Sequence, residues 1–199
     1  MLTTTAFDRH VEQLFDILNR LAAALRQAGV EYQVIGGVAA FIHVSERDPR
    51  LARMTRDVDL AIDRDCLQAL AEAVRPFGFE YRHAAGVDML VDTAQPKARS
   101  AVHLVFGSVP DCSPPVRSAE GLSVASVADL VRMKLTSFRE NDRVHVRDMD
   151  SVGLITAEIE GQLSDLFRQR LVQVRARLTP PVIDLPAAHV AIIQTNACK

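Results

Sequence analysis

Two aspartates within a short apolar segment constrain this chain more than any other feature. In RDVDLAID, a valine, a leucine and an isoleucine alternate with Asp57 and Asp59. Successive side chains of a strand point to opposite faces, so the apolar residues share one face and the two carboxylates share the other, about 6–7 Å apart. Like charges this close repel, and a cation between them relieves the repulsion. The pattern predicts a strand that holds a hard divalent cation or, alternatively, two carboxylates that face solvent at a sheet edge.

A glycine pair precedes this strand. Gly36 and Gly37 separate the β-favouring segment EYQVI from the apolar segment VAAFIHV, which is predicted to form a short helix. Glycine lets a ligand approach the backbone closely, and the N–H groups at a helix start bind phosphate oxygens. The pair therefore indicates either a phosphate-binding turn or only a tight strand-to-helix turn.

The hydrophobic pattern of the whole chain predicts an α+β fold. A small mixed β-sheet is flanked by helices, and a helical annex follows at the C-terminal end. Ser126 and Asp129 form a capping box that begins the annex. Helices are predicted at 7–28, 38–44, 64–75, 127–141, 142–155 and 159–178. Strands are predicted at 31–35, 56–63 and 101–107, a strand or hairpin at 79–92, and a loop at 109–121.

Three regions are predicted along the chain. Residues 1–122 form the core, residues 123–179 form the helical annex that completes the cleft, and residues 180–199 form a tail. The first helix and the tail both carry apolar surface, which makes a homodimer plausible.

Composition excludes several classes of protein. Of 199 residues, 48% are hydrophobic and 24% are charged, which is ordinary for a globular protein and excludes disorder and a membrane span. The net charge of -2 argues against a basic surface that coats duplex nucleic acid. A cluster of four arginines indicates either a local basic groove or a solvated basic loop. These are Arg47, Arg50, Arg53 and Arg56.

The cysteines indicate a reducing compartment. Cys66, Cys112 and Cys198 are odd in number and show no CxxC spacing, which excludes a disulfide framework and a zinc ribbon. The N-terminus lacks a basic start followed by an apolar stretch, so no secretory signal is predicted. We expect a cytoplasmic protein that does not associate with a membrane.

Two charged residues lie within apolar stripes of the predicted annex. Lys134 and Asp148 each have apolar neighbours four positions before and after them on a helix. Burying a lone charge is costly, so each needs a partner. Either they pair with each other and tie two helices together, or they line a functional cleft.

The order of these motifs resembles the nucleotidyltransferase superfamily, which has the DNA polymerase β-like fold. The matching segments are IGGVAAFIHV and TRDVDLAID. The resemblance implies an NTP held through its phosphates by Gly36 and Gly37, with Mg²⁺ or Mn²⁺ bound by Asp57 and Asp59.

The annex is similar to the helical region of AbiEii-type nucleotidyltransferases. The similarity lies in ADLVRMKLTSFRENDRVHVRDMDSV. In that branch a lysine and an aspartate join the active site, which implies catalytic roles for Lys134 and Asp148, nucleotide contact by Lys134 and phosphate contact by Arg139. AbiEii-type relatives are toxins paired with an antitoxin protein, and other branches modify small molecules. The acceptor implied is therefore an RNA, a protein or a small molecule.

One position departs from the family pattern. Members with polymerase-like chemistry usually carry a third carboxylate on a later strand, and here AVHLVFG has His103 instead. A neutral imidazole is a weaker Mg²⁺ ligand than a carboxylate, although it can accept a proton from an attacking hydroxyl. Asp88 or Asp92, on the preceding strand, could restore the charge.

Three functions are compatible with the sequence. The leading interpretation is an NTP-dependent nucleotidyltransferase that uses Asp57, Asp59, His103, Lys134 and Asp148. The second is a non-catalytic binding protein on the same fold, which the missing third carboxylate favours. The third is a metal-dependent phosphohydrolase that uses the same aspartates.

Overall fold

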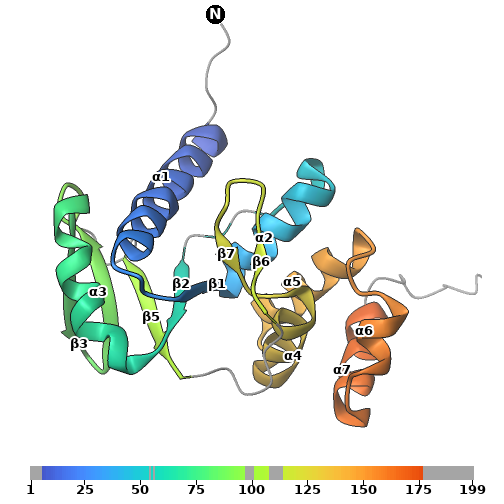
Figure 1. Ribbon diagram of the computed structural model, residues 1–199. Helices are drawn as coiled ribbons and strands as arrows, with labels where there is room; N and C mark the ends of the chain where they lie inside the picture. Colours follow the sequence, from blue (N-terminus) through green and yellow to red (C-terminus); the bar gives the residue numbers. More distant parts are fainter. Residues whose placement is uncertain (1–5, 54, 56, 97–100, 108–113, 177–199) are drawn as a thin grey trace, which may run out of the picture.

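The chain folds around a mixed β-sheet with helices packed beside it (Figure 1). The computed structural model describes residues 6–53, 55, 57–96, 101–107 and 114–176, with side chains from residue 11 onward. The predicted α+β class, with its mixed sheet and helical annex, is confirmed. The predicted tail, together with Arg56, Cys112 and Cys198, lies outside the described residues.

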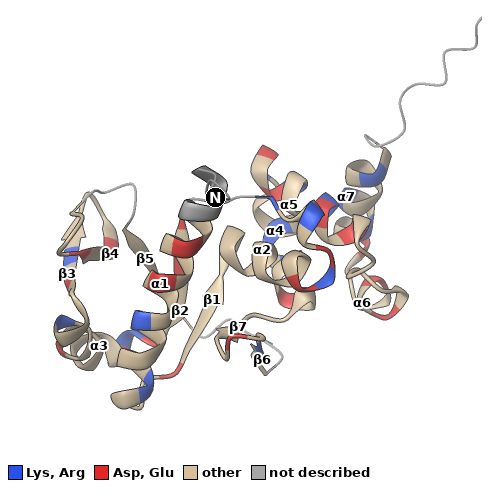
Figure 2. Cartoon of the chain, turned by 90° about the horizontal axis from the view of Figure 1, so that it is seen from above, with Lys and Arg blue, Asp and Glu red and all other residues tan. Residues whose placement is uncertain are grey.

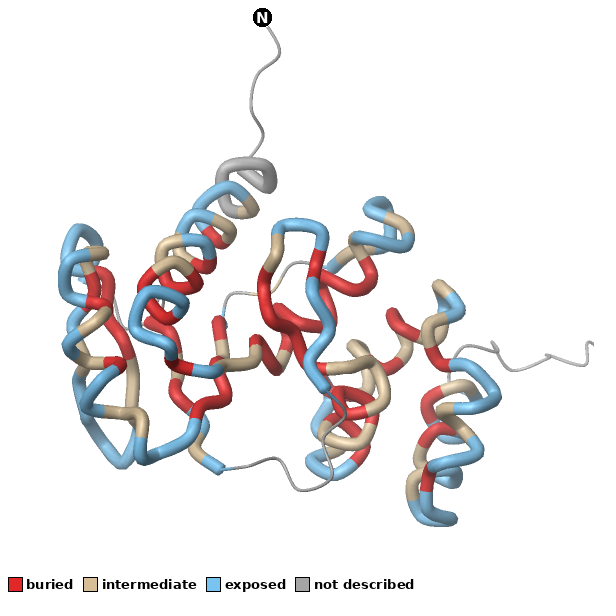
Figure 3. Tube along the Cα trace, in the orientation of Figure 1, coloured by how far each residue is buried: buried red, intermediate tan, exposed pale blue. Residues whose placement is uncertain are grey.

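Helix α1 (Ala6–Gln27) packs one apolar side against the protein. Its apolar residues recur every three or four positions, which places them on one stripe of the helix. Gly29 follows in the left-handed conformation, with φ of +65°, and this conformation ends helices. Figure 3 shows the buried side of the helix. The buried residues of this stripe include Leu14, Leu18, Leu21 and Leu25.

Seven strands of the described chain form one sheet in the order β3-β4-β5-β2-β1-β7-β6. The pairs β2–β5 and β1–β7 are parallel, and the other neighbours are antiparallel. The two-residue strands β6 and β7 were not predicted, because they are too short to show alternation. The strands are β1 (Tyr32–Ile35), β2 (Val58–Ile62), β3 (Phe79–Ala84), β4 (Val87–Asp92), β5 (Val102–Phe106), β6 (Val116–Arg117) and β7 (Ser123–Val124).

Strand β2 shows the predicted alternation. Val58, Leu60 and Ile62 are buried on one face. Asp59 lies half-buried on the opposite face, and Asp57 is exposed just before the strand begins. The strand therefore presents the carboxylate of Asp59 on the face opposite Val58, Leu60 and Ile62.

The register of the sheet places His103 of β5 directly beside Asp59. Met89 of β4 is in turn paired with His103. The three residues form a row across one face of the sheet, since directly paired residues share a face. Asp88 and Asp92 are each an odd number of positions from Met89 along β4, so they project from the other face.

Helix α1 covers that other face together with α3 (Leu67–Ala73). Arg20 of α1 stacks on the ring of Phe79, with 4.5 Å between the guanidinium carbon and the ring centre. The same guanidinium lies 2.5 Å from a carboxylate oxygen of Asp92. The aspartates of β4 therefore lie on the face that packs against α1, and they are not part of the row that contains Asp59.

Helix α2 (Gly36–Arg47) follows β1 without an intervening loop and contacts β2, α4 and α5. Its first two turns are apolar on all sides, as expected for a helix surrounded by other elements. It extends to Arg47, three residues beyond the prediction, and a 3₁₀ turn (Pro49–Leu51) follows. The buried residues are Gly37, Val38, Ala39, Ala40, Phe41, Ile42, His43 and Val44.

Helix α4 begins at Ser126 of the predicted capping box, where the structure shows the serine half of that motif. Ser126 Oγ accepts a hydrogen bond from the backbone N–H of Asp129 at 3.1 Å, which caps α4. Helix α5 then packs against both α4 and α2. The helices are α4 (Val127–Ser137), α5 (Glu140–Ser151), α6 (Ala157–Gly161) and α7 (Asp165–Ala176).

The prediction of one long helix over residues 159–178 is wrong. Helix α6 ends at Gly161 and α7 starts at Asp165. Ser164 Oγ accepts a hydrogen bond from the N–H of Phe167 at 3.3 Å and so caps a new helix. No helix among the described residues is long and apolar enough to cross a bilayer.

Candidate functional site

The start of α2 lies against the carboxylate of Asp59. Gly36 has φ of +72°, and a Cβ at this position would lie 2.1 Å from Asp59 Oδ2. Only glycine satisfies both the conformation and the space. The absence of a side chain at Gly36 thus leaves room for a carboxylate of β2 against the first turn of α2.

The second glycine faces a different pair of residues. A Cβ on Gly37 would lie 2.5 Å from Thr55 Oγ1 and 3.2 Å from His145 Cε1. Neither Thr55 nor His145 was a predicted site residue. The signal for His145 was its place on α5, one helical turn before Asp148, because residues three apart share a helix face.

The N-terminus of α2 offers donors to an anion. The preceding residue, Ile35, provides no side-chain cap, and the first turn contains no acidic residue. The first N–H groups of a helix have no partner within the helix, and the helix dipole favours negative charge there. This end of α2 is therefore suited to phosphate oxygens.

The carboxylate of Asp59 is destabilised where it lies. Burial raises its pKa, and the charge of Asp57 raises it further. His103 and Lys134 oppose this rise, and His103 Nδ1 lies 3.3 Å from Asp59 Oδ1. A bound cation would relieve the repulsion between the two carboxylates.

The side chains fit a Mg²⁺ ion whose ligands come partly from the protein and partly from a bound substrate. Within the described residues, no group of three or more His, Cys, Asp or Glu side chains is arranged to hold a metal alone. Magnesium commonly takes one or two protein carboxylates and completes its coordination with water and substrate phosphates. Asp59, which lies against Gly36 at the start of α2, and Asp57, two residues before it, match that pattern of one or two carboxylates.

His103 occupies the place predicted for it, and the acidic residues of β4 do not replace it. Asp88 accepts a hydrogen bond from the Tyr81 hydroxyl at 2.5 Å, on the face away from Asp59. Asp92 is engaged by Arg20 on that same face. The expectation that either could restore a third carboxylate is therefore wrong, because both side chains point away from the row.

Lys134 is buried and paired, although not with the predicted partner. Its Nζ lies 3.0 Å from Asp142 Oδ1. Asp142 also accepts hydrogen bonds from Ser137 Oγ and from the backbone N–H of Arg139. Burial raises the pKa of Asp142, but the hydrogen bonds from Ser137 and Lys134 outweigh it and leave that pKa below its usual value.

Asp148 has its own partner. Arg53 Nε lies 2.9 Å from Asp148 Oδ2, and Arg53 Nη2 lies 3.3 Å from Asp148 Oδ1. The alternative of a Lys134–Asp148 pair is therefore wrong, since two separate ion pairs satisfy the two buried charges. One of these pairs joins α4 to α5, and the other joins α5 to the segment between α2 and β2.

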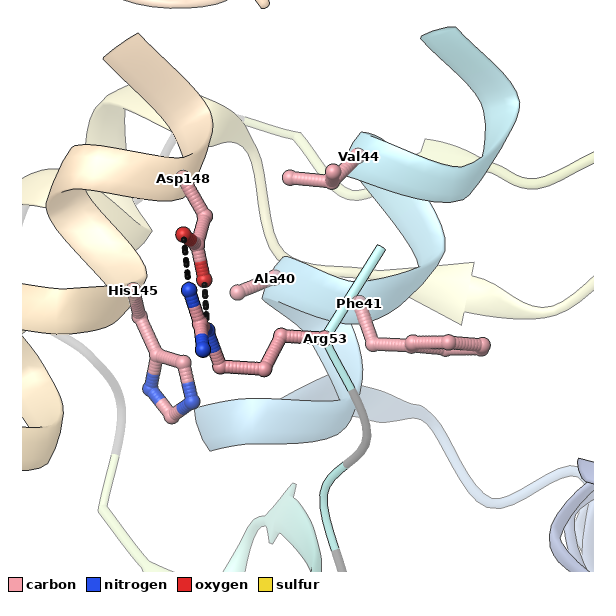
Figure 4. A pocket seen from close by; sticks show the side chains of 6 residues that line it. All are labelled: Ala40, Phe41, Val44, Arg53, His145 and Asp148. Carbon is pink, nitrogen blue, oxygen red and sulfur yellow. Dashed lines mark hydrogen bonds and ion pairs between the residues drawn. The ribbon is translucent and has the colours of Figure 1, made fainter. Parts of the chain in front are cut away.

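A small pocket lies where α2 meets α5 (Figure 4). Figure 4 shows Arg53 reaching across to Asp148, with the His145 ring beside them. Buried inside, His145 Nδ1 has no hydrogen-bond partner among the described residues. Burial and then the charge of Lys134 lower the pKa of His145. The pocket is lined by Ala40, Phe41, Val44, Arg53, His145 and Asp148.

The predicted basic residues have varied surroundings. Arg139 is exposed at the start of α5, where its backbone N–H bonds Asp142. Arg50 bonds its neighbour Asp48 at 2.9 Å, whereas Arg53 belongs to the pocket. Lys and Arg lie close to Asp and Glu on the same helices (Figure 2).

Comparison with known proteins gives structural likenesses only. No family model and no curated protein matches the sequence. The crystal structure of ANT(2")-Ia in complex with adenylyl-2"-tobramycin matches with a TM-score of 0.52 at 11% identity, over 82% of this chain and 97% of that one.

A second likeness is to an antigenic nucleotidyltransferase-like protein from Paracoccidioides brasiliensis. Its TM-score is 0.53 at 18% identity, and the match covers 81% of this chain and 86% of that one. The chain therefore has the nucleotidyltransferase-like fold that its motifs predict.

Proposed function

We propose that this protein transfers a nucleotide from an NTP to an acceptor, using Mg²⁺ or Mn²⁺ held by Asp57 and Asp59. The observation that carries the proposal is the packing of the Asp59 carboxylate against Gly36, where a Cβ would lie 2.1 Å from Oδ2. A metal-binding carboxylate and a phosphate-binding helix end are thereby adjacent, as a metal–triphosphate complex requires.

Each residue has a task in this reaction. A bound divalent ion neutralises charge on the triphosphate. The N–H groups of Gly36 and Gly37 bind phosphate oxygens, and Lys134 offsets the negative charge that develops on them. The ion pair with Asp142 positions Lys134 for this task, and the charge of Lys134 acts to lower the pKa of Asp59.

The chemical step is a substitution at the α-phosphorus. The acceptor hydroxyl oxygen forms a bond to the α-phosphorus while the bond from that phosphorus to the bridging oxygen breaks, and pyrophosphate leaves with the bonding electrons. His103 accepts the proton of the hydroxyl and later passes it to solvent. Its place beside Asp59, at 3.3 Å, supports this role.

Asp148 and Arg139 have less direct roles in the proposal. Asp148 forms an ion pair with Arg53, which also lines the pocket, and this contact supports a positioning role for the aspartate. Arg139 is exposed at the start of α5, two residues beyond the end of α4, and we propose that it contacts a phosphate when substrate is bound.

The acceptor is an RNA, a protein or a small molecule. The structure of ANT(2")-Ia contains adenylyl-2"-tobramycin, which makes a small-molecule acceptor the first to test. The alternative proposal is that the protein is an AbiEii-type toxin, which would have a separate antitoxin protein as its partner. A homodimer and a cytoplasmic location belong to the same set of proposals.

A second candidate is a binding protein that has lost catalysis. His103 favours it, since an imidazole replaces the carboxylate expected beside Asp59. Such a protein would bind nucleotide without transferring it. A phosphohydrolase would instead release phosphate with no acceptor present, so product analysis separates it from a transferase.

The test is a thermal-shift panel of the four NTPs, each with and without Mg²⁺. A ligand that binds only the folded state at a hundredfold excess over its dissociation constant adds about 2.7 kcal/mol to stability. We expect a metal-dependent shift that Asp59→Asn removes and that the exposed control Asp65→Asn keeps. No shift with any nucleotide would overturn the proposal.

A further inference from the structure

Two histidines lie near the start of α2. His103 contacts Asp59, and Asp59 lies against Gly36. His145 lies against Gly37 through its Cε1 atom. The first residue of the helix thus lies against a carboxylate, and the second lies against an imidazole.

One nitrogen of the His145 ring, Nδ1, differs from most buried polar atoms. Nδ1 is buried and makes no hydrogen bond within the described part of the chain. A buried polar atom without a partner is destabilising, and most such atoms in folded proteins are satisfied by protein, water or ligand. Because no described residue bonds Nδ1, this atom is available to a water molecule or to a bound group.

The surroundings determine the charge of that group. Asp142 and Asp148 are the acidic residues that act on His145, and each is already paired with a cation. Burial lowers the pKa of the ring and so favours its neutral form, in which one nitrogen carries a hydrogen to donate. The donors at the helix start and the charge of Lys134 favour an anion in this place.

We propose that His145 donates a hydrogen bond from its ring to the terminal phosphate of the NTP, an inference that rests on the proposed function. The phosphate that reacts stays beside Asp59. The triphosphate then crosses the N-terminus of α2 from Gly36 toward Gly37, and its far end meets His145. The same contact holds pyrophosphate until it leaves, so His145 is a determinant of triphosphate length and not of the base.

The experiment compares the affinity of wild-type protein and two His145 variants for nucleotides of different phosphate number. The probes are the nucleoside mono-, di- and triphosphates that carry the base of the most stabilising NTP. Inorganic tripolyphosphate is the fourth probe, and all four are used with Mg²⁺. His145→Leu removes the donor. His145→Asn keeps an amide nitrogen near the position of Nδ1.

We expect His145→Leu to weaken binding of the NTP and of tripolyphosphate about 10- to 100-fold, as for loss of a hydrogen bond to a charged group. Binding of the monophosphate should stay unchanged. His145→Asn should retain most of the NTP affinity. His83→Asn, an exposed histidine on β3, is the matched control and should behave as wild type.

Several results would overturn the inference. An equal loss of affinity for the mono- and triphosphate would mean that His145 contacts the nucleoside or only stabilises the fold. Melting temperatures would identify the second case. Unchanged NTP binding in His145→Leu, with metal-dependent binding still lost in Asp59→Asn, would overturn the role of His145 and leave the transferase intact. Absence of nucleotide binding by wild type would overturn both.

Discussion

Asp142, in the first turn of α5, holds the ammonium group of Lys134 of α4 at 3.0 Å. The two side chains are only 12% and 10% exposed, so the pair is nearly removed from water. Asp142 gains two further donors, Ser137 Oγ and the N–H of Arg139. One carboxylate therefore positions the lysine and caps the next helix.

Removal of this carboxylate should be strongly destabilising. Asp142→Ala leaves the buried Lys134 charge without its partner, and breaking a buried pair from one side costs about 3–5 kcal/mol. The double variant Lys134→Met with Asp142→Leu should recover part of that loss, because no lone charge remains. Urea unfolding of the single and double variants measures this difference. Equal stability of Asp142→Ala and wild type would contradict it.

Substitution of the glycines should separate backbone strain from steric conflict. Gly36 and Gly86 both have positive φ, +72° and +77°, but only at Gly36 would a Cβ meet other atoms. Gly86→Ala should cost about 1–2 kcal/mol from the left-handed backbone alone. Gly36→Ala should cost more, because it also displaces the Asp59 carboxylate, and it should abolish metal-dependent nucleotide binding. Denaturation midpoints and nucleotide titrations of both variants test this.

Much of the fold was predictable because its signals are local. The alternation of β2, the glycine pair and the N-cap at Ser126 each lie within a few residues, and all appear in the structure. The errors also have local causes. A second cap at Ser164 divided a continuous apolar stripe into two helices, and two-residue strands gave no pattern to detect.

The partners of buried charges were not predictable in the same way. Burial of Lys134 and Asp148 follows from helical periodicity, and both are buried. Their actual partners, Asp142 and Arg53, depend on how α5 is rotated and on the path of the segment after α2. His145 was missed for the same reason, since its contact with Gly37 exists only after α2 and α5 pack together.

The Arg53–Asp148 pair should respond unequally to loss of its two members. The Arg53 side chain is 62% exposed, whereas that of Asp148 is 12% exposed. Arg53→Ala leaves a nearly buried carboxylate unpaired, but Asp148→Asn leaves an arginine that water can solvate. We expect Arg53→Ala to be the more destabilising change. Chemical denaturation at neutral pH compares the two variants, and the opposite ranking would contradict this reading of the pair.

Stability should depend on pH through His145. Burial holds the pKa of this ring below the value of about 6.5 expected in the unfolded chain. As pH falls through 6.5, the unfolded chain therefore takes up a proton that the folded protein still excludes, and stability declines until the lower folded pKa is reached. The groups that face the ring include Lys134 and Arg53, which disfavour its protonation, and Asp148 and Asp142, which favour it.

His145→Asn removes the titrating group, so its free energy of unfolding should lose less between pH 7.5 and pH 5 than that of wild type. The comparison isolates His145, because the carboxylates that titrate in the same range are present in both proteins. Urea unfolding at each pH provides the measurement. Parallel pH profiles for the two proteins would mean that the ring is solvated and titrates normally, in which case Nδ1 already has water as its partner.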